Sequence, residues 1–438
     1  MPKIPLSSPL KSESRLFYGW VLVIACFFIG TAVIGTRLSF GVFFTPIQDE
    51  FLLSRAATSG VAAVYNVLCC VFSILGGWTI DRYGPRIVML SIALFTGLSL
   101  VLSSQTSSLW QLYITYSLLL AIGHGPWYIV TVATMSRWFK KRRGLAMGIA
   151  SSGVGLGTFI MAPFAAFLIA NYSWRIAYLV LGLIAWVVAI PLSRLFKRDP
   201  REVGALPDGL KPSAADTKPD DAGNSLQSAG LSLPQALRSR SFWLLIFILV
   251  FLASNAFLAL THIVPHARDM GFSPGQAASI LSVFGGTLIL GRITIGFVSD
   301  KMGRRLSVIL CALLQLGSMV WLLGARQLWQ LYLFMFIFGF AYAGLAPTIA
   351  SLVSHTFGLH RIGSIMGALD VGFGGGAALG PFIGGLIFDV NGSYADAFKL
   401  GAAVVLAATL LVVLVRRETG ETLEGGYSPG RGLVIGPE

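Results

Sequence analysis

The sequence GGWTIDRYGPR occupies Gly76–Arg86, and a related stretch, IGFVSDKMGRR, occupies Ile295–Arg305 at an offset of 219 residues (295 − 76). The pentapeptide LWQLY at 109–113 returns at 328–332 with the same offset. The glycines at 148, 153, 155 and 157 likewise return at 367, 372, 374 and 376. Three segments in one register indicate that the chain is a duplicated unit, each copy about half of the 438 residues.

The composition is that of a membrane protein. Hydrophobic residues make up 55% of the chain and charged residues only 12%, against roughly 25% charged in soluble domains. A helix needs roughly 20 apolar residues to cross a bilayer. Twelve such runs occur, at about 17–44, 56–77, 85–104, 109–136, 144–170, 174–195, 241–265, 275–298, 305–324, 328–354, 362–388 and 396–415. We therefore expect an all-α membrane protein with 12 transmembrane helices.

A proline-containing polar stretch separates the sixth run from the seventh. The expected organisation is a tail (1–16), an N-terminal six-helix bundle (17–195), a linker (196–240), a C-terminal six-helix bundle (241–415) and a second tail (416–438). Because six is an even number, both copies would insert in the same orientation. The sequence therefore predicts two parallel, pseudo-symmetric bundles related by an axis along the membrane normal.

The distribution of basic residues predicts the orientation. If the N-terminus is inside, nearly all of the 32 Lys and Arg residues fall in inner segments, including the run 140–143. This asymmetry follows the positive-inside rule. We expect a multi-pass protein of the cell (plasma or inner) membrane with both termini cytoplasmic. The net charge of +13 is then a topology signal, and we expect no nucleic-acid partner.

The repeated pattern G-x-x-x-D-(R/K)-x-G-x-R resembles the signature between the second and third helices of the major facilitator superfamily, and its counterpart between the eighth and ninth. In that superfamily the element is a latch that holds one conformation closed. The resemblance assigns this gating role to Gly77, Asp81, Arg82, Gly84, Arg86, Gly296, Asp300, Gly303 and Arg305. The alternative is a charged turn that only fixes topology.

Four further segments resemble the monocarboxylate transporter family and its bacterial oxalate–formate antiporter relatives. They are RWFKKRRGLAMGIASSGVGLG (137–157), YGWVLV (18–23), SFGVFF (39–44) and GRITIGFVSD (291–300). The resemblance implies a secondary active transporter of lactate- or pyruvate-like monocarboxylates that works by alternating access as a proton-coupled symporter. The alternatives are exchange of a counter-anion, as in the oxalate–formate type, and efflux of larger amphipathic compounds.

Three charged residues lie in the interior of the expected spans, away from their ends: Arg37, Arg292 and Asp370. Ionisable groups in a span are costly and mark functional sites by default, and two guanidinium groups against one carboxylate favour anionic substrates. Arg292 matches the family's substrate-binding arginine in position, or else forms a structural pair. Arg37 falls one place before a basic residue of the family, so it either binds substrate or extends toward the outer interface.

The sequence does not identify the residue that would accept the coupled proton. The family often places an aspartate one turn before the eighth-helix arginine, where this chain has Leu288. Asp370 or a histidine would have to substitute. Neutral polar residues near mid-span are further candidates for substrate binding, each with packing as its alternative: His124, Asn66, Asn255, His262 and Tyr342.

The glycine repeats predict close helix packing. Gly144 and Gly148, with Gly363 and Gly367, follow the small-xxx-small pattern of helix contacts. We expect packing surfaces that slide during alternating access. Nothing in the sequence resembles a zinc motif, a nucleophile elbow or a nucleotide loop, so we expect no enzyme activity, no cofactor and a monomer in the lipid bilayer.

Overall fold

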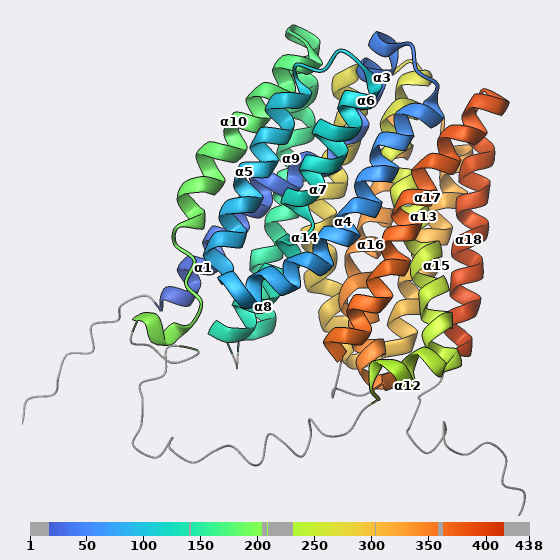
Figure 1. Ribbon diagram of the computed structural model, residues 1–438. Coiled ribbons are helices and arrows are strands. Elements are labelled where there is room, and N and C mark those ends of the chain that lie inside the picture. Colours follow the sequence, from blue (N-terminus) through green and yellow to red (C-terminus); the bar gives the residue numbers. More distant parts are fainter. Residues whose placement is uncertain are drawn as a thin grey trace, which may run out of the picture.

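Twelve helices long and apolar enough to cross a membrane make up the described part of the chain, which confirms the expected fold class. The computed structural model describes residues 17–139, 142–203, 208, 231–302, 304–357 and 362–415. Figure 1 shows the helices running side by side in two groups, one from each half of the sequence.

The first half contains six spans, and the bounds of its elements follow in chain order: α1 (Tyr18–Ile29), η1 (Gly30–Ile34), α2 (Gly35–Leu38), α3 (Phe40–Phe51), α4 (Arg55–Tyr83), α5 (Pro85–Ser103), α6 (Leu109–Leu112), η2 (Tyr113–Leu118), α7 (Leu119–His124), α8 (Trp127–Trp138), α9 (Arg143–Asn171) and α10 (Trp174–Ser193). A short 3-10 turn, η3 (Pro200–Val203), follows.

The second half also contains six spans, preceded by the short helix α12 (Leu233–Arg238). They are α13 (Arg240–Asp269), α14 (Pro274–Met302), α15 (Arg304–Gly324), α16 (Leu328–Phe357), α17 (Ile362–Asn391) and α18 (Ala395–Leu414). The predicted runs differ from these spans mainly at their ends, where charged and polar residues extend the helices beyond the apolar stretch.

The first and fourth spans are interrupted, whereas their counterparts in the second half are continuous. The π segment η1 and the residue Ser39 (φ −84°, ψ 0°) break the first span between α1 and α3. A second π segment, η2, and the turn at Gly125–Pro126 break the fourth. Single π turns inside α-helices occur frequently at functional sites, and these two spans supply much of the cavity described below.

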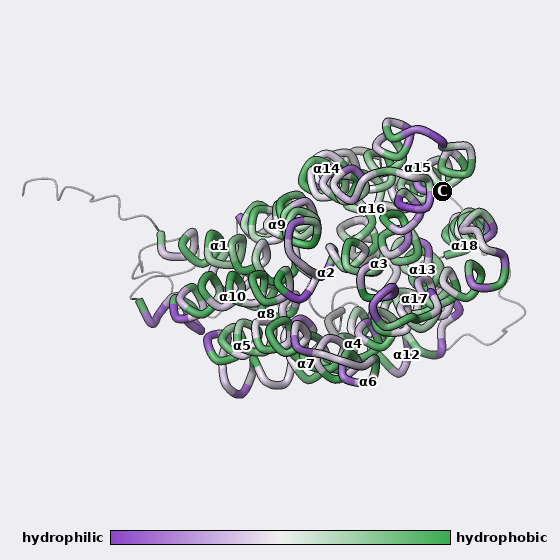
Figure 2. Tube along the Cα trace, turned by 90° about the horizontal axis from the view of Figure 1, so that it is seen from above, coloured by the Kyte–Doolittle hydropathy of each residue, from purple (hydrophilic) through white to green (hydrophobic). Residues whose placement is uncertain are grey.

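Two helix pairs join the halves. In Figure 1, α4 lies beside α17 and α9 beside α14, and both pairs are in close contact. Figure 2, which looks along the helices, shows apolar tube on nearly every helix. A continuous buried core includes residues of both halves, while two smaller cores lie within single halves. The connection between the halves is therefore concentrated on two seams, α4–α17 and α9–α14.

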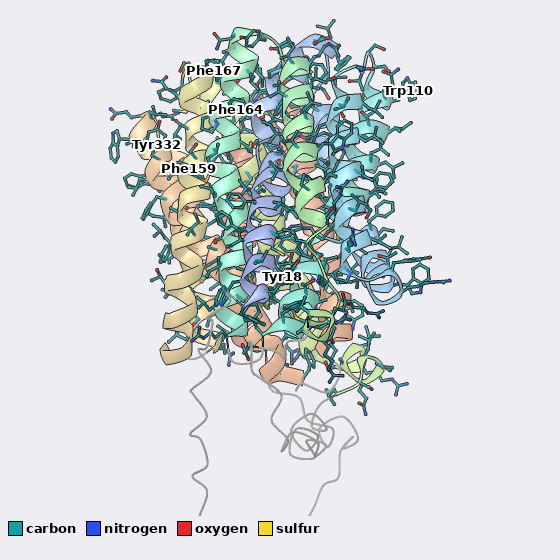
Figure 3. All side chains as sticks on the ribbon, turned by 90° about the vertical axis from the view of Figure 1, so that its left-hand side faces the viewer. Tyr18, Trp110, Phe159, Phe164, Phe167 and Tyr332 are labelled. Carbon is teal, nitrogen blue, oxygen red and sulfur yellow. The ribbon has the colours of Figure 1, made fainter. Side chains whose placement is uncertain are left out.

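The two ends of the bundle are named here by the chain. The terminal face is the end where α1 begins and α18 ends, and the far face is the opposite end. The two LWQLY segments begin α6 and α16. Figure 3 shows Trp110 and Tyr332 toward the far face and Tyr18 toward the terminal face. The repeated pentapeptides thus occupy equivalent positions in the two halves.

The residues of the predicted gating motif lie at the terminal face. Gly84 has φ +80° and joins α4 to α5, a backbone conformation that favours glycine. Arg82 lies over the rings of Trp78 and Tyr83, and Arg305 donates from Nε to the carbonyl of Val412 (3.1 Å). Arg86 is exposed. Gly303 and the side chains of Asp81 and Asp300 lie outside the described residues, as do the surroundings of Gly296.

Candidate functional site

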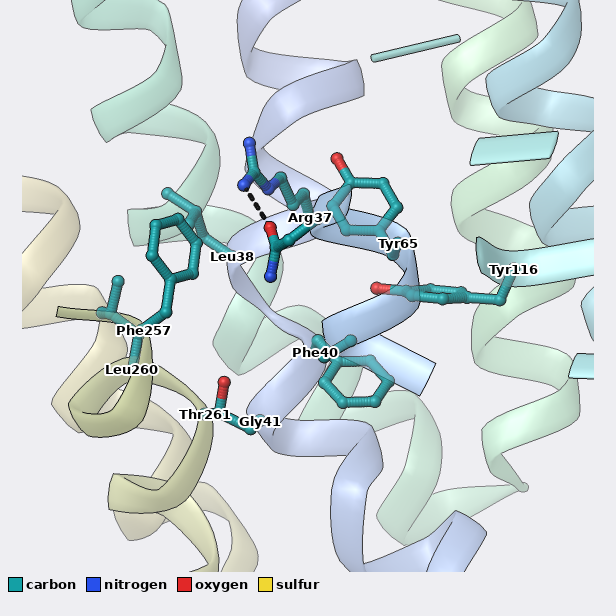
Figure 4. A pocket seen from close by; sticks show the side chains of 11 residues that line it. Arg37, Leu38, Phe40, Gly41, Tyr65, Tyr116, Phe257, Leu260 and Thr261 are labelled. Carbon is teal, nitrogen blue, oxygen red and sulfur yellow. Dashed lines mark hydrogen bonds between the residues drawn. The ribbon is translucent and has the colours of Figure 1, made fainter. Parts of the chain in front are cut away.

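A cavity lies between the two halves. Its walls come from the interrupted first span, from α4, from η2 and from α13. Figure 4 shows these side chains converging on one space. The lining residues are Arg37, Leu38, Phe40, Gly41, Ala62, Tyr65, Asn66, Tyr116, Phe257, Leu260 and Thr261.

Arg37 places a guanidinium group in this cavity. The side chain leaves the main chain at the break between α2 and α3 and lies between two aromatic rings (Figure 4). Its Cζ atom is 5.1 Å from the ring centroid of Tyr65 and 5.1 Å from that of Phe257. Both rings offer cation–π attraction. Because Tyr65 belongs to the first half and Phe257 to the second, the cation is shared between the halves.

Asn66 holds the same guanidinium group from α4. The Nη2 atom of Arg37 donates to Oδ1 of Asn66 (2.8 Å), and Nδ2 of Asn66 donates to the carbonyl of Ala377 on α17 (2.9 Å). Among the described residues, no carboxylate pairs with Arg37 and none lines the cavity. An unneutralised guanidinium in a mostly apolar space favours an anionic ligand, and a carboxylate matches its paired donors.

His124 supports the cavity from behind. It is buried, and its Nδ1 atom lies 2.8 Å from the hydroxyl of Tyr65. The imidazole is not part of the cavity wall. Tyr116 lies nearby on η2, and its hydroxyl points toward the cavity (Figure 4). The sequence predicted His124 as a binding residue, and the structure places Tyr65, rather than His124, in the cavity wall.

A network centred on Arg55 closes the far face. Its guanidinium donates to both carboxylate oxygens of Asp269 on α13 (2.7 Å each) and to the hydroxyl of Tyr394 (2.7 Å). The carboxylate of Asp389 on α17 accepts the backbone N–H groups of Arg55 and Ala56 (2.8 Å each). Asp389 therefore caps the N-terminus of α4 across the interface between the halves, where negative charge is favoured.

His262 contacts this network and directly follows Thr261, which lines the cavity. Its ring is fully buried and stacks at a tilt on Tyr394, with ring centroids 4.8 Å apart. Its Nδ1 atom is 3.1 Å from the hydroxyl of Tyr394, and its Nε2 atom is 2.8 Å from the carbonyl of Pro381. His262 does not line the cavity, so its contacts are those of a residue that joins α13 to α17.

Arg292 lies away from the cavity, at the α9–α14 seam. Its Nη1 atom donates to the backbone carbonyl of Ser151 on α9 (2.5 Å). The residue is not in the cavity wall, and of the described carboxylates, Asp370 included, none pairs with it. In this conformation the structure therefore brings Arg37, and not Arg292, into the cavity.

The remaining sequence candidates are dispersed. Asp370 is exposed on α17, and the Cys70 thiol of α4 lies 3.9 Å from its backbone carbonyl. Asn255 is fully buried and faces α18, since a Cβ at Gly401 would lie 2.7 Å from its Oδ1 atom. Tyr342 is partly buried against Phe284. None of these three side chains lines the cavity.

The glycines of the fifth spans, α9 and α17, differ in their surroundings along the helix. A Cβ atom on Gly155 or Gly285 would lie within 2.7 Å of backbone atoms across the α9–α14 seam. By contrast, Gly144, Gly148 and Gly367, which are nearer the terminal face, have nothing within 4 Å of such an atom. The small residues of α9 and α17 near the terminal face are therefore uncovered, while those in the middle of the α9–α14 seam are in contact.

The comparisons with known proteins agree with this geometry. A family model described as Major Facilitator Superfamily matches residues 20–273 and 263–430. The chain belongs to the major facilitator superfamily. It is accordingly a membrane transporter and not an enzyme. In the described part of the chain, no group of three or more His, Cys, Asp or Glu side chains is arranged to hold a metal ion.

Relatives within the major facilitator superfamily bear the name monocarboxylate transporter. Monocarboxylate transporter 13 of Bos taurus is 29% identical over 398 residues, covering 90% of this chain and 89% of the relative. Monocarboxylate transporter 12 of Xenopus laevis is 27% identical over 419 residues, covering 91% and 89%. The chain thus resembles this family along nearly its whole length, as the sequence segments predicted.

Solved structures of the superfamily share the fold. One is a bacterial homolog of the human lysosomal transporter Spinster, in an inward-facing and unoccupied conformation (TM-score 0.68, 17% identity, 92% of this chain and 96% of that chain). Another is a mutant of the nucleoside transporter NupG (TM-score 0.72, 12% identity, 91% and 99%). At these identities the likeness concerns architecture.

Sequence reasoning missed the aromatic walls of the cavity and most of the far-face network. Tyr65 precedes Asn66 directly, and aromatic residues near a buried cation were a usable signal. Asp269 and Asp389 lie at the ends of spans, where carboxylates are ordinarily solvated. Only the fold shows that they meet Arg55.

Proposed function

We propose that this chain is a secondary active transporter of small monocarboxylates of the lactate or pyruvate type. The observation that carries the proposal is the cavity between the halves, in which Arg37 is the single charged side chain among the described lining residues. A carboxylate can accept two parallel N–H bonds from such a group. Apart from Asn66 and Thr261, the remainder of the wall is apolar or aromatic and suits a short acyl chain.

Alternating access accounts for the two ends of the molecule. Contacts between the halves close the far face at Arg55, Asp269 and Asp389, whereas glycines near the terminal face remain uncovered. We assign the terminal face to the cytoplasm of a cell membrane, in line with the basic inner segments. The described conformation is then the inward-facing one, from which substrate leaves or enters on the cytoplasmic side.

Coupling is assigned to protons, with Asp370 as the acceptor. This carboxylate lies on α17, seven residues before Ala377, which is about 10 Å along a helix, on the side of the terminal face. The position allows exchange of a proton with the cytoplasm in the inward-facing state. Exchange of one anion for another remains the alternative coupling, and efflux of larger amphipathic compounds the alternative substrate class.

Transport measurements test the proposal. Purified protein in proteoliposomes should take up labelled lactate or pyruvate faster when the pH is lower on the side of the substrate. Uptake that ignores pH and requires an internal counter-anion would favour exchange. Uptake of neither acid, with transport of a hydrophobic dye instead, would favour the efflux carrier.

Alanine variants of the basic residues test which of them binds the substrate. Arg37→Ala should raise the KM for the monocarboxylate by about 10- to 100-fold, because a hydrogen bond to a charged group contributes about 1.5–3 kcal/mol. Arg292→Ala should act mainly on the maximal rate, since its bond to Ser151 joins the halves. Lys399→Ala is the matched control, because this cation is exposed and paired with Asp396. An unchanged KM in Arg37→Ala would contradict the assigned role.

A further inference from the structure

Two prolines leave main-chain carbonyl groups without their helical partners. Pro163 lies inside α9 and Pro381 inside α17. In an α-helix the N–H of each residue bonds the carbonyl four residues earlier, and proline has no N–H. The carbonyls of Phe159 and Ala377 therefore lack a helical donor, and a buried carbonyl without a partner is destabilising.

Each of these carbonyls accepts a hydrogen bond from the other half of the molecule. The hydroxyl of Ser282 on α14 donates to Phe159 (3.0 Å), and Nδ2 of Asn66 on α4 donates to Ala377 (2.9 Å). Helices α9 and α17 are the fifth spans of their halves, and α4 and α14 are the second spans. The duplicated fold thus contains one such bond on each of its two seams.

The two donor side chains differ in their other hydrogen-bonding groups. Ser282 has only its hydroxyl group. Asn66 has a carbonyl oxygen as well as its NH₂ group, and this Oδ1 atom accepts from Arg37 (2.8 Å), as the dashed line in Figure 4 shows. Arginine can only donate and a carbonyl can only accept, so the orientation of the amide is fixed by its partners. Asn66 is 4% exposed, and both the oxygen and the nitrogen of its side-chain amide have a hydrogen-bond partner.

We infer that Asn66 is a positioning residue that ties the direction of the Arg37 guanidinium to the contact between α4 and α17. With the seam closed, Ala377 fixes the amide and the amide fixes Arg37. When the halves separate at this level, Asn66 loses the carbonyl and turns together with Arg37. The affinity of the cavity for an anion then depends on the conformational state. This inference rests on the proposed role of Arg37 in binding the substrate.

Matched variants separate positioning from packing. Asn66→Ala should raise the KM for lactate about tenfold, because it removes a bond to a charged group, with a smaller change in maximal rate. Ser282→Ala removes the same kind of carbonyl bond from the other seam but touches no cation, so its KM should stay within about twofold of the parent protein. Equal effects of the two variants on KM would overturn the inference.

The prolines distinguish positioning from direct contact with substrate. Pro381→Ala gives the chain an N–H that competes with Asn66 for the Ala377 carbonyl, so it should raise KM, whereas Pro163→Ala should not. If Asn66 acted only as a substrate ligand, both proline variants would leave KM unchanged, and the inference would fail.

The double variant Asn66→Ala/Pro381→Ala covers the case in which Asn66→Ala folds poorly. It restores a partner to Ala377, so thermal stability should recover while KM stays high. Recovery of KM as well would show that Asn66 acts through α17 alone and would refute the link to Arg37. An effect of Arg37→Ala without any effect of Asn66→Ala would sink the inference and leave the proposed function standing. No effect of Arg37→Ala would remove both.

Discussion

His262 donates from Nε2 to the carbonyl oxygen of Pro381 across 2.8 Å. Because a carbonyl can only accept, the proton of the neutral ring lies on Nε2, and Nδ1 is an acceptor. The hydroxyl of Tyr394 lies 3.1 Å from Nδ1 and itself accepts from Arg55, so its proton is directed at the imidazole. A chain of hydrogen bonds thus runs from the far-face network to Pro381 of α17, four residues after Ala377, whose carbonyl accepts from Asn66.

A positive charge alone, without the planar guanidinium donors, should be insufficient at position 37 for selective binding of carboxylates. Arg37→Lys keeps the positive charge but loses the planar donors that meet a carboxylate in parallel. Lactate uptake by this variant should therefore show a KM between those of the parent protein and Arg37→Ala, with a weaker preference for carboxylates over other small anions. Competition by a panel of unlabelled anions measures the preference. A lysine variant as selective as the parent would argue against bidentate recognition.

Breaking the far-face ion pair should shift the population toward a conformation open at that face. In Asp269→Asn the bidentate bond to Arg55 loses its charge. The Asp269 side chain is 38% exposed, so solvent screening limits the effect to about 1 kcal/mol, or roughly a fivefold shift. Reaction of a cysteine placed at Thr261 with an impermeant thiol reagent added at the far face reports the change.

Glu50→Gln is the matched control for that experiment. Glu50 also pairs with an arginine, Arg175, but both belong to the first half. Removing this pair should leave the reaction of the reporter cysteine as it was. A comparable rise in both variants would mean that the far-face network stabilises the fold and does not select a conformation.

The hydroxyl of Tyr394 should matter at every physiological pH. Burial raises the pKa of this phenol above its ordinary value, against the opposing charge of Arg55, so the group keeps its proton below about pH 10. Tyr394→Phe should therefore lower the maximal transport rate by the same factor between about pH 5 and pH 8. A deficit that appears only at one end of this range would contradict a neutral donor.

A large side chain at Gly148 should prevent closure of the terminal face. A Cβ atom there meets nothing within 4 Å in the described conformation, so Gly148→Leu should fold and still bind lactate, as equilibrium binding would show, yet transport should stop. Gly155→Leu tests the opposite case, because its Cβ would lie 2.7 Å from the carbonyl of Gly285. That variant should lower the melting temperature. Normal transport by Gly148→Leu would exclude this residue from the surfaces that close.

Asp370 should determine the energetics of uptake. If it accepts the coupled proton, Asp370→Asn should abolish stimulation by a pH gradient while lactate–lactate exchange across the liposome membrane continues. Parallel measurement of net uptake and exchange in the same liposomes provides the internal control. Retained stimulation in the variant would move the proton site to another residue.

The sequence predicted the architecture well because apolar length is a physical requirement of the bilayer. It did not determine which way Arg37 faces. Each α-helical residue turns the chain by about 100°, and the π segment Gly30–Ile34 changes that phase just before the arginine. The regular periodicity of an α-helix therefore does not predict the direction of side chains that follow this π segment, including that of Arg37. Arg292 illustrates a second gap, since its match to the family in position does not reveal that it bonds Ser151 in this conformation.

The arrangement around Arg55 has a consequence for leakage. The guanidinium bonds Asp269 and Tyr394 while Asp389 caps the same end of α4, so separation of the halves at this end would break all of these bonds. Partial opening would break several of these hydrogen bonds without creating a path wide enough for a solute. An idle transporter of this design spends little time with a continuous aqueous route across its membrane, so solutes that it does not carry leak slowly between turnovers.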